Sequence, residues 1–221
     1  MIFVENKKCK PLTLKKRHPN ALVVDVTSTS PDPSMRVLSP FYPHFNVQIP
    51  FTSPEEMTAT CVEAVWQGLK VFQSEDIDLG TLRNASMQNI KRTARRFGQP
   101  LGHRKGIHGT ELLNYYDARM LIYLPTYKWV LDNVSLAHNA VMRIKDLSLT
   151  NDIVLLDYNT NTEFRDISKP LSHAGLIKLY IEGLYPTYEQ YPLPLSDEEK
   201  LAKKKNKNGK HSNTNLELTL F

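Results

Sequence analysis

One carboxylate in an otherwise mostly apolar segment is the residue of this chain best suited to acid–base chemistry. Glu63 lies in the segment 62–70, and Trp66 follows it three residues later. About twenty residues earlier, Phe41 and Tyr42 place two aromatic rings in a loop bounded by prolines. Together these segments could build a pocket for a planar base with an acid or base beside it. Burial among aromatic rings would raise the pKa of the carboxyl group towards neutral pH.

Gln67 and Lys70 follow Glu63 at helical spacing and share one stripe with it on the predicted helix. This stripe has two interpretations. It is either a solvated Glu–Lys stripe, which stabilises a helix by a few tenths of a kcal/mol, or the polar wall of a binding site. The spacing alone does not separate the two.

The two segments resemble the signature of the NADAR family, whose members are similar to N-glycosidases that act on ADP-ribosyl or nucleotide-like substrates. Segment 38–43, L-S-P-F-Y-P, matches five of the six positions of the family's L-S-N-F-Y-P. In the second box, typically S-V-E-H-Y-Y-Q-A-Q-K, the matching residues are Val62, Glu63, Gln67 and Lys70. The resemblance implies a hydrolase of the N-glycosidase type that acts on such a substrate.

A basic stretch at residues 86–97 is predicted as a helix that stops at Gly98. Its sequence Ile90–Arg95 resembles a third family box, A-K-x-x-G-R, with Ala94 in place of the glycine. The resemblance implies that Lys91 and Arg95 contact a pyrophosphate. The alternative is a solvated helix face.

Cleavage of an N-glycosidic bond passes through an oxocarbenium-like transition state, which a carboxylate stabilises while an acid protonates the departing base. Glu63 is the candidate for the first role. Asp157, at a strand end, and Asp166, in the next loop, are candidates for a second acid or a ribose-hydroxyl clamp, although Asp157 could equally cap a turn. The family usually has aspartate, two residues, then Trp-Gly; residues 163–166 read Glu-Phe-Arg-Asp instead. This departure leaves the substrate's identity open.

The segments that must position these residues have the sequence patterns of both strands and helices. Strands are predicted at 21–26, which should be buried, at 45–49, and at 153–158, which is apolar throughout and should be central. These patterns, with the resemblance, predict an α+β fold class: a single, mainly helical domain around a small β-sheet, similar to the NADAR fold.

Three further helices are predicted. One begins at Ser53, where a capping serine precedes proline and Glu56. A second spans about 110–133 with a break at Pro125, and its aromatic residues could serve either the core or a base-binding site. The third spans 171–183.

The length of 221 residues suits one domain with a full core. The expected organisation is a basic N-terminal segment at 1–20, a NADAR-like domain at 21–195 and a lysine-rich, disordered tail at 196–221. Six lysines and no acid lie in 200–210, whereas the whole chain has a formal charge of +5, so the remainder carries −1. The basicity therefore belongs mainly to the tail.

Other site classes have little support in the sequence. Cys9 and Cys61 form no metal or disulfide pattern, and His103 and His108 have no third ligand near them, so neither a metal nor a cofactor is expected. Without an apolar run of ~20 residues or a signal-peptide layout, we expect a cytoplasmic protein with no membrane partner. The expected partner is a small nucleotide or ADP-ribose conjugate.

Two other functions remain open. The chain could be a non-catalytic nucleotide-sensing or nucleic-acid-binding module that kept the pocket. It could also be a glycosidase that acts on bases in DNA or RNA, held to the polymer by the lysine-rich tail. Steep salt dependence of binding would distinguish a polymer ligand from a small one.

Truncation after Leu195 should leave the melting temperature nearly unchanged, because the lysine-rich tail has no periodic apolar pattern to pack on a domain. Thermal unfolding of the truncated and full-length proteins tests this. Loss of cooperative unfolding in the shorter protein would show that the tail stabilises the domain.

Overall fold

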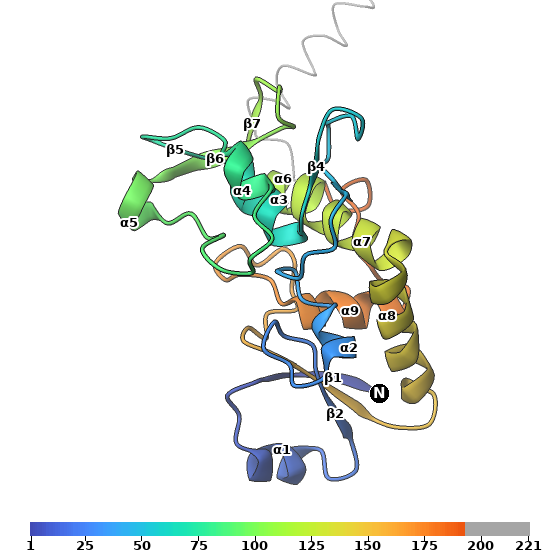
Figure 1. Cartoon of the computed structure of the whole chain (residues 1–221). Helices are drawn as coiled ribbons and strands as arrows, with labels where there is room; N and C mark the ends of the chain where they lie inside the picture. Colours follow the sequence, from blue (N-terminus) through green and yellow to red (C-terminus); the bar gives the residue numbers. More distant parts are fainter. Residues whose placement is uncertain (193–221) are drawn as a thin grey trace, which may run out of the picture. The chain divides into compact units, whose positions relative to one another are not determined.

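A five-residue apolar strand, β8 (Ile153–Asp157), lies in the sheet at one end of the folded unit, where Figure 1 labels β1 and β2. The computed structural model describes residues 1–192, of which Met1–Gln190 form one compact unit. β8 is the central strand of a three-stranded parallel sheet of order β1-β8-β2, as its continuous apolar sequence predicts. In this sheet Ile2 of β1 (Ile2–Asn6) and Leu22 of β2 (Leu22–Asp25) both pair with Ile153.

The pairing of β1 with β8 makes the N-terminal residues part of the domain. A boundary at residue 20 is therefore wrong, since helix α1 (Pro11–Arg17) also docks through buried Leu14. β2 is not buried but is an edge strand in which Leu22 and Val23 are exposed. The expectation for residues 196–221 lies outside the described residues.

Two small antiparallel sheets form the other end of the unit. One pairs β3 (Val47–Gln48) with β4 (Thr58–Ala59). The other has the order β5-β6-β7, from Lys70–Phe72, Pro100–Arg104 and Leu112–Leu113.

Helix α3 (Val62–Gly68) connects these two sheets, so the prediction that a helix begins at Ser53 is wrong. The capping signal forms only a single turn, in which the Met57 N–H donates to the Ser53 carbonyl. Thr58 then pairs with Gln48, and the Cys61 thiol caps α3 instead by accepting from the Ala64 N–H. Strand pairing on both sides of α3 outweighs the local capping preference.

The helix predicted at 86–97 is also wrong, except for its last turn. Only α5 (Ala94–Phe97) forms there, and Gly98 ends it with a positive φ of 80°, as predicted. Before α5, Met87 and Asn89 have positive φ angles, and the Ile90 and Arg92 side chains are buried. The chain therefore crosses this region as an irregular segment.

Two further short helices are α2 (Pro33–Arg36) and α4 (Leu79–Leu82).

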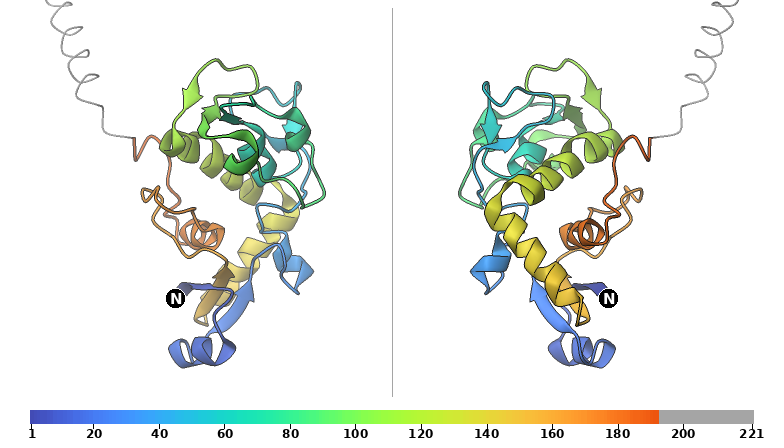
Figure 2. Two further views of the ribbon diagram at one scale, coloured as in Figure 1. Left: turned by 90° about the vertical axis from the view of Figure 1, so that its left-hand side faces the viewer. Right: turned by 90° about the vertical axis from the view of Figure 1, so that its right-hand side faces the viewer.

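A run of helices connects the two ends of the unit. It consists of α6 (Tyr115–Ala118), the π-helical segment η1 (Arg119–Tyr123), α7 (Leu124–Asn133) and α8 (Ser135–Ser148), and Figure 2 shows them in succession. Pro125 has no N–H to donate, which accounts for the wider turn directly before it. The sequence pattern predicted the helix to 133 and missed α8.

The last helix, α9 (His173–Ile181), confirms the prediction for 171–183. With 35% helix and 15% strand, the domain has an α+β fold. None of the helices within residues 1–192 is both long enough and apolar enough to cross a membrane.

Loop 38–43 is held to the domain by hydrogen bonds at two places. The hydroxyl of Tyr127, on α7, donates to the Leu38 carbonyl over 2.7 Å, and both residues are buried. The Glu63 backbone N–H, at the start of α3, donates to the Pro40 carbonyl over 2.9 Å. The position of Phe41 therefore depends on two helices that lie far apart in sequence.

Tyr127→Phe should lower the free energy of unfolding by about 1–3 kcal/mol, because it leaves the buried Leu38 carbonyl without its donor. Urea unfolding measures the change. Tyr158→Phe is the matched control: its hydroxyl also makes one hydrogen bond, to Thr29, but Tyr158 is exposed and its loss should matter little. Equal losses of unfolding free energy in the two variants would show that the buried hydrogen bond from Tyr127 to Leu38 stabilises the domain no more than an exposed one.

Candidate active site

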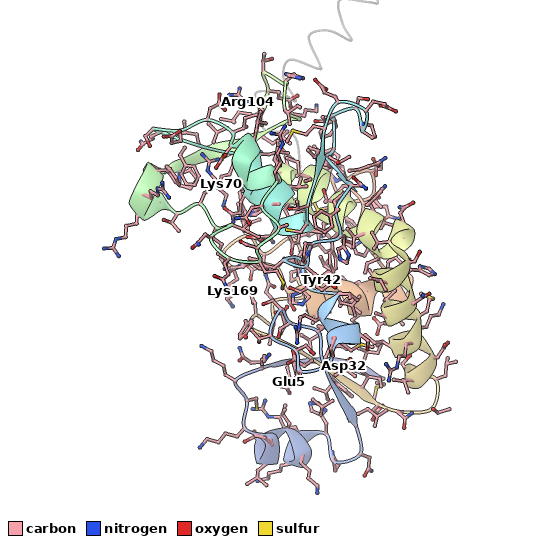
Figure 3. All side chains as sticks on the ribbon, in the orientation of Figure 1. Glu5, Asp32, Tyr42, Lys70, Arg104 and Lys169 are labelled. Carbon is pink, nitrogen blue, oxygen red and sulfur yellow. The ribbon has the colours of Figure 1, made fainter. Side chains whose placement is uncertain are left out.

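A cavity of about 300 Å³ lies between α3, loop 38–43, η1 and the loop before α9. Its wall combines one carboxylate, three cationic side chains and four aromatic rings. The lining residues are Phe41, Glu63, Trp66, Gln67, Lys70, Lys91, Tyr115, Arg119, Tyr123, Pro170 and Leu171. In Figure 3, Lys70 marks this part of the unit, whereas Glu5 and Asp32 lie at the end with the parallel sheet.

Glu63 is the acid of the cavity. It lies in the first turn of α3 and is only 8% exposed. Burial raises the pKa of its carboxyl group, while the hydrogen bond from Gln67 and the charges of Lys91 and Lys70 oppose that rise. Water is excluded from much of the carboxylate, so its basicity is greater than that of a surface glutamate.

Gln67 connects this acid to a cation. Its Nε2 donates to Glu63 Oε1 over 2.9 Å, and its Oε1 accepts from Lys70 Nζ and from the Arg92 backbone N–H, each over 3.1 Å. Two donors at Oε1 fix the orientation of the amide, and Nε2 must then face the carboxylate. Glu63 Oε2 is left without a hydrogen-bond partner among the described residues.

The aromatic wall is built around Trp66. The indole stacks on the His103 ring with 3.8 Å between centroids, and the rings of Tyr115 and Tyr123 meet it edge-on at 5.7 Å. His103 is buried, and burial together with the charge of Lys70 lowers its pKa to about 3. The ring that supports Trp66 is therefore neutral at physiological pH.

Three residues of the run from α6 to η1 reach the cavity: Tyr115, Arg119 and Tyr123. They are four residues apart, and the wide π turn keeps residues at this spacing on nearly the same face. Burial, followed by the negative charge of Glu63, raises the pKa of Tyr123 well above its ordinary value. Its phenol thus remains protonated and able to donate a hydrogen bond.

The cavity carries excess positive charge. Burial lowers the pKa of Lys70, and the charge of Glu63 partly offsets that effect. Lys91 is exposed at the rim with its ammonium 5.5 Å from the centre of the Phe41 ring. With Arg119, three cations face one carboxylate, so the site suits an anionic ligand with a planar group.

Six of the ten residues predicted from the sequence line this cavity: Phe41, Glu63, Trp66, Gln67, Lys70 and Lys91. The other lining residues, none of them a predicted site residue, are Tyr115, Arg119, Tyr123, Pro170 and Leu171. The aromatic content of the helix predicted at 110–133 was a signal for Tyr115 and Tyr123, whereas no sequence pattern pointed to Arg119, Pro170 or Leu171.

Two predicted binding residues do not line the cavity. The Tyr42 ring packs against His44 at 5.1 Å. Arg95 is exposed on α5, and the buried cation of that stretch is Arg92, which donates to the carbonyls of Gln67, Lys70 and Asp76. The match to the A-K-x-x-G-R box was the reason to pair Lys91 with Arg95, and the structure directs Arg95 onto α5 (Ala94–Phe97), away from the cavity.

The two predicted second acids are also outside the lining. Asp157 is buried at the end of β8, where it pairs with His173 Nδ1 over 2.9 Å and accepts from the Ser172 hydroxyl over 2.7 Å. It therefore holds the start of α9. The Asp166 carboxylate accepts from the Ser168 N–H within its own loop.

Both ring nitrogens of His173 face acceptors, because Nε2 lies 3.0 Å from the Val26 carbonyl. Burial alone would lower the pKa of His173, but the charge of Asp157 and these hydrogen bonds raise it. Burial would likewise raise the pKa of Asp157, but His173 lowers it. The pair is thus ionised in the folded protein.

No three His, Cys, Asp or Glu side chains within residues 1–192 are grouped as a metal site requires.

Comparison with known proteins identifies a family. A family of unknown function (DUF6939) matches residues 6–177, which is more than half of the chain. No curated protein sequence matches, and no solved structure matches.

Asp157→Asn should cost about 3 kcal/mol of stability at pH 6, since it leaves a buried imidazolium without its anion. A raised His173 pKa stabilises the fold below pH 6.5, and that contribution is lost as pH rises through the folded-state pKa. The variant should therefore lose less stability than the wild type between pH 6 and 9 in urea unfolding. Asp166→Asn should leave the unfolding midpoint unchanged, and a large effect there would contradict these assignments.

Proposed function

We propose that this chain, which belongs to the family of unknown function DUF6939, is an N-glycosidase that cleaves the N-glycosidic bond of an ADP-ribosyl or nucleotide-like substrate. One observation carries the proposal: a buried carboxylate with a raised pKa, Glu63, lies on the wall of a cavity lined by aromatic rings and cations. The resemblance of its sequence boxes to the NADAR family supports the same chemistry.

The lining fits the parts of a nucleotide. The ring of Trp66, backed by His103, and the ring of Phe41 offer flat surfaces for a base. Lys70 and Lys91 supply charge for a phosphate group. A volume of about 300 Å³ is at the lower end for ligand pockets. It suits a nucleoside-sized group, and the rest of a larger conjugate would extend past Lys91 at the rim.

Hydrolysis breaks the bond between the anomeric carbon and the base nitrogen, and the bonding electrons leave with the base. In the proposed mechanism, Glu63 Oε2 accepts a proton from water as the water attacks the anomeric carbon. Its negative charge also stabilises the oxocarbenium-like transition state. Gln67, fixed by Lys70 and the Arg92 N–H, holds the carboxylate in place.

The departing base must gain a proton, and among residues 1–192 no second carboxylate lines the cavity. Tyr123, whose phenol is protonated, is a hydrogen-bond donor available to it. Purines can also leave after protonation by solvent.

The lack of a second acid favours one alternative, a nucleotide-sensing module that binds its ligand without cleaving it. Asp157 and Asp166, which could have supplied that acid, have their carboxylates engaged elsewhere. Binding without turnover would identify this function.

Glu63→Gln should reduce base release at least ~10²-fold, the usual contribution of an acid–base group, and leave ligand binding within about tenfold, since the amide keeps the size of the side chain. Chromatography of free base released from ADP-ribosylated guanine, NAD and nucleotides measures this. Wild-type base release should rise with pH through the raised pKa of Glu63, because the ionised form is the base.

Glu55→Gln, an exposed glutamate outside the cavity, is the matched control and should release base at the wild-type rate. Unchanged turnover in Glu63→Gln would remove this residue from the mechanism. Ligand binding with no turnover of any substrate by the wild type would favour the sensing module.

A further inference from the structure

Arg119 is the least exposed cation of the cavity wall, at 2%, and its partners are not carboxylates. Its Nη1 donates to the carbonyls of Phe164 and Asp166, each over 2.9 Å. Its Nη2 donates to the Lys169 carbonyl over 2.8 Å and approaches the Tyr115 hydroxyl at 3.4 Å. A single guanidinium on η1 thus binds a loop 45 to 50 residues further along the chain.

This loop forms part of the cavity wall. Pro170 and Leu171 line the cavity, and the Lys169 carbonyl that Arg119 holds belongs to the peptide bond directly before Pro170. Asn161 also donates to the Asp166 carbonyl over 3.2 Å, but Asn161 belongs, like the loop, to the connection between β8 and α9. Of these contacts, those from Arg119 are the ones that attach the loop to the helix across the cavity.

A guanidinium has five N–H groups. The loop and Tyr115 occupy the four N–H groups of both Nη atoms of Arg119, so a two-point contact with a phosphate would have to displace either Tyr115 or the loop. Lys70 gives one donor to Gln67, and the ammonium of Lys91 lies over the Phe41 ring. The lysines therefore have more donors to spare for an anion than the arginine, which keeps only its Nε–H.

We infer that Arg119 is a positioning residue, which holds loop 163–171 as a wall of the cavity rather than binding the anion of the ligand. The loop departs here from the Asp-x-x-Trp-Gly element that the sequence resemblance leads one to expect. In this chain the packing of that wall depends on a guanidinium instead. The inference rests on the proposed function only where it concerns turnover.

Limited proteolysis tests the inference directly. Cleavage after Glu163 by Glu-C protease and after Phe164 by chymotrypsin, located by mass spectrometry, reports on opening of the loop. In Arg119→Gln both sites should be cleaved at least about tenfold faster than in the wild type, because opening no longer breaks these hydrogen bonds. Arg119→Lys should also be cleaved faster, since an ammonium keeps the charge but not the planar fork.

Arg92→Gln is the matched control. Arg92 is likewise buried and donates to three backbone carbonyls, but they belong to Gln67, Lys70 and Asp76. Its loss should not speed cleavage after Glu163 or Phe164. Equal acceleration in both variants would mean general loosening of the fold and would overturn the inference, as would unchanged cleavage in a folded Arg119 variant.

Chemical rescue separates positioning from charge. Millimolar methylguanidinium added to Arg119→Ala should restore resistance to cleavage at the two sites, whereas methylammonium should not. Base release from the substrate panel should recover in parallel. Restoration by methylammonium to the same extent would show that the positive charge alone matters. A wild type without turnover would refute the proposed function and leave the proteolysis result to decide the role of Arg119.

Discussion

The side-chain amide of Gln67 is the contact on which the polar half of the cavity depends. Its oxygen accepts from Lys70 Nζ and the Arg92 N–H, so its nitrogen must face Glu63. A reversed amide would place two oxygens together and an NH₂ group against an ammonium. One amide thus sets the position of the acid and of one cation, and attaches the irregular segment at 90–92 to α3. The irregular path of that segment is what lets a backbone N–H reach into the site.

The domain buries charge in three different ways, each suited to a different role. Asp157 and His173 neutralise each other, which stabilises the junction of β8 and α9 and leaves neither group for chemistry. The Arg119 guanidinium donates hydrogen bonds to three backbone carbonyls of loop 163–171 and thereby positions this loop as a wall of the cavity. Glu63 receives a single neutral hydrogen bond, and the charges of Lys91, Lys70 and His173 do not outweigh the effect of burial, so its pKa is still raised. Incomplete compensation of a buried acid is characteristic of functional sites.

Sequence patterns predicted the structure best where they are local. Residues 62–68 form a helix, and α3 carries Glu63 and Gln67 at the expected spacing, whereas Lys70, predicted on the same helix, is the first residue of β5. The patterns failed where non-local contacts decide the conformation. Ser53 has a good capping sequence, but the chain beyond it pairs as β4 with β3. Arg95 lies one helical turn from Lys91 in sequence, but the buried Ile90 and Arg92 side chains prevent a helix there, so Arg95 is directed to the exposed α5.

By itself, the sequence determined the aromatic loop of the site and the acid and the amide at helical spacing, and, away from the site, the central apolar strand of the parallel sheet. These features depend on residue type and on periods of two or four residues, which can be read without knowing the fold. Only the tertiary structure decided which side chains meet. Arg119 and Tyr123 line the same cavity as Glu63 because the π turn before Pro125 directs them there. Asp157 forms an ion pair with His173 because β8 ends beside α9. Such contacts join residues that are tens of positions apart, where sequence periodicity carries no information.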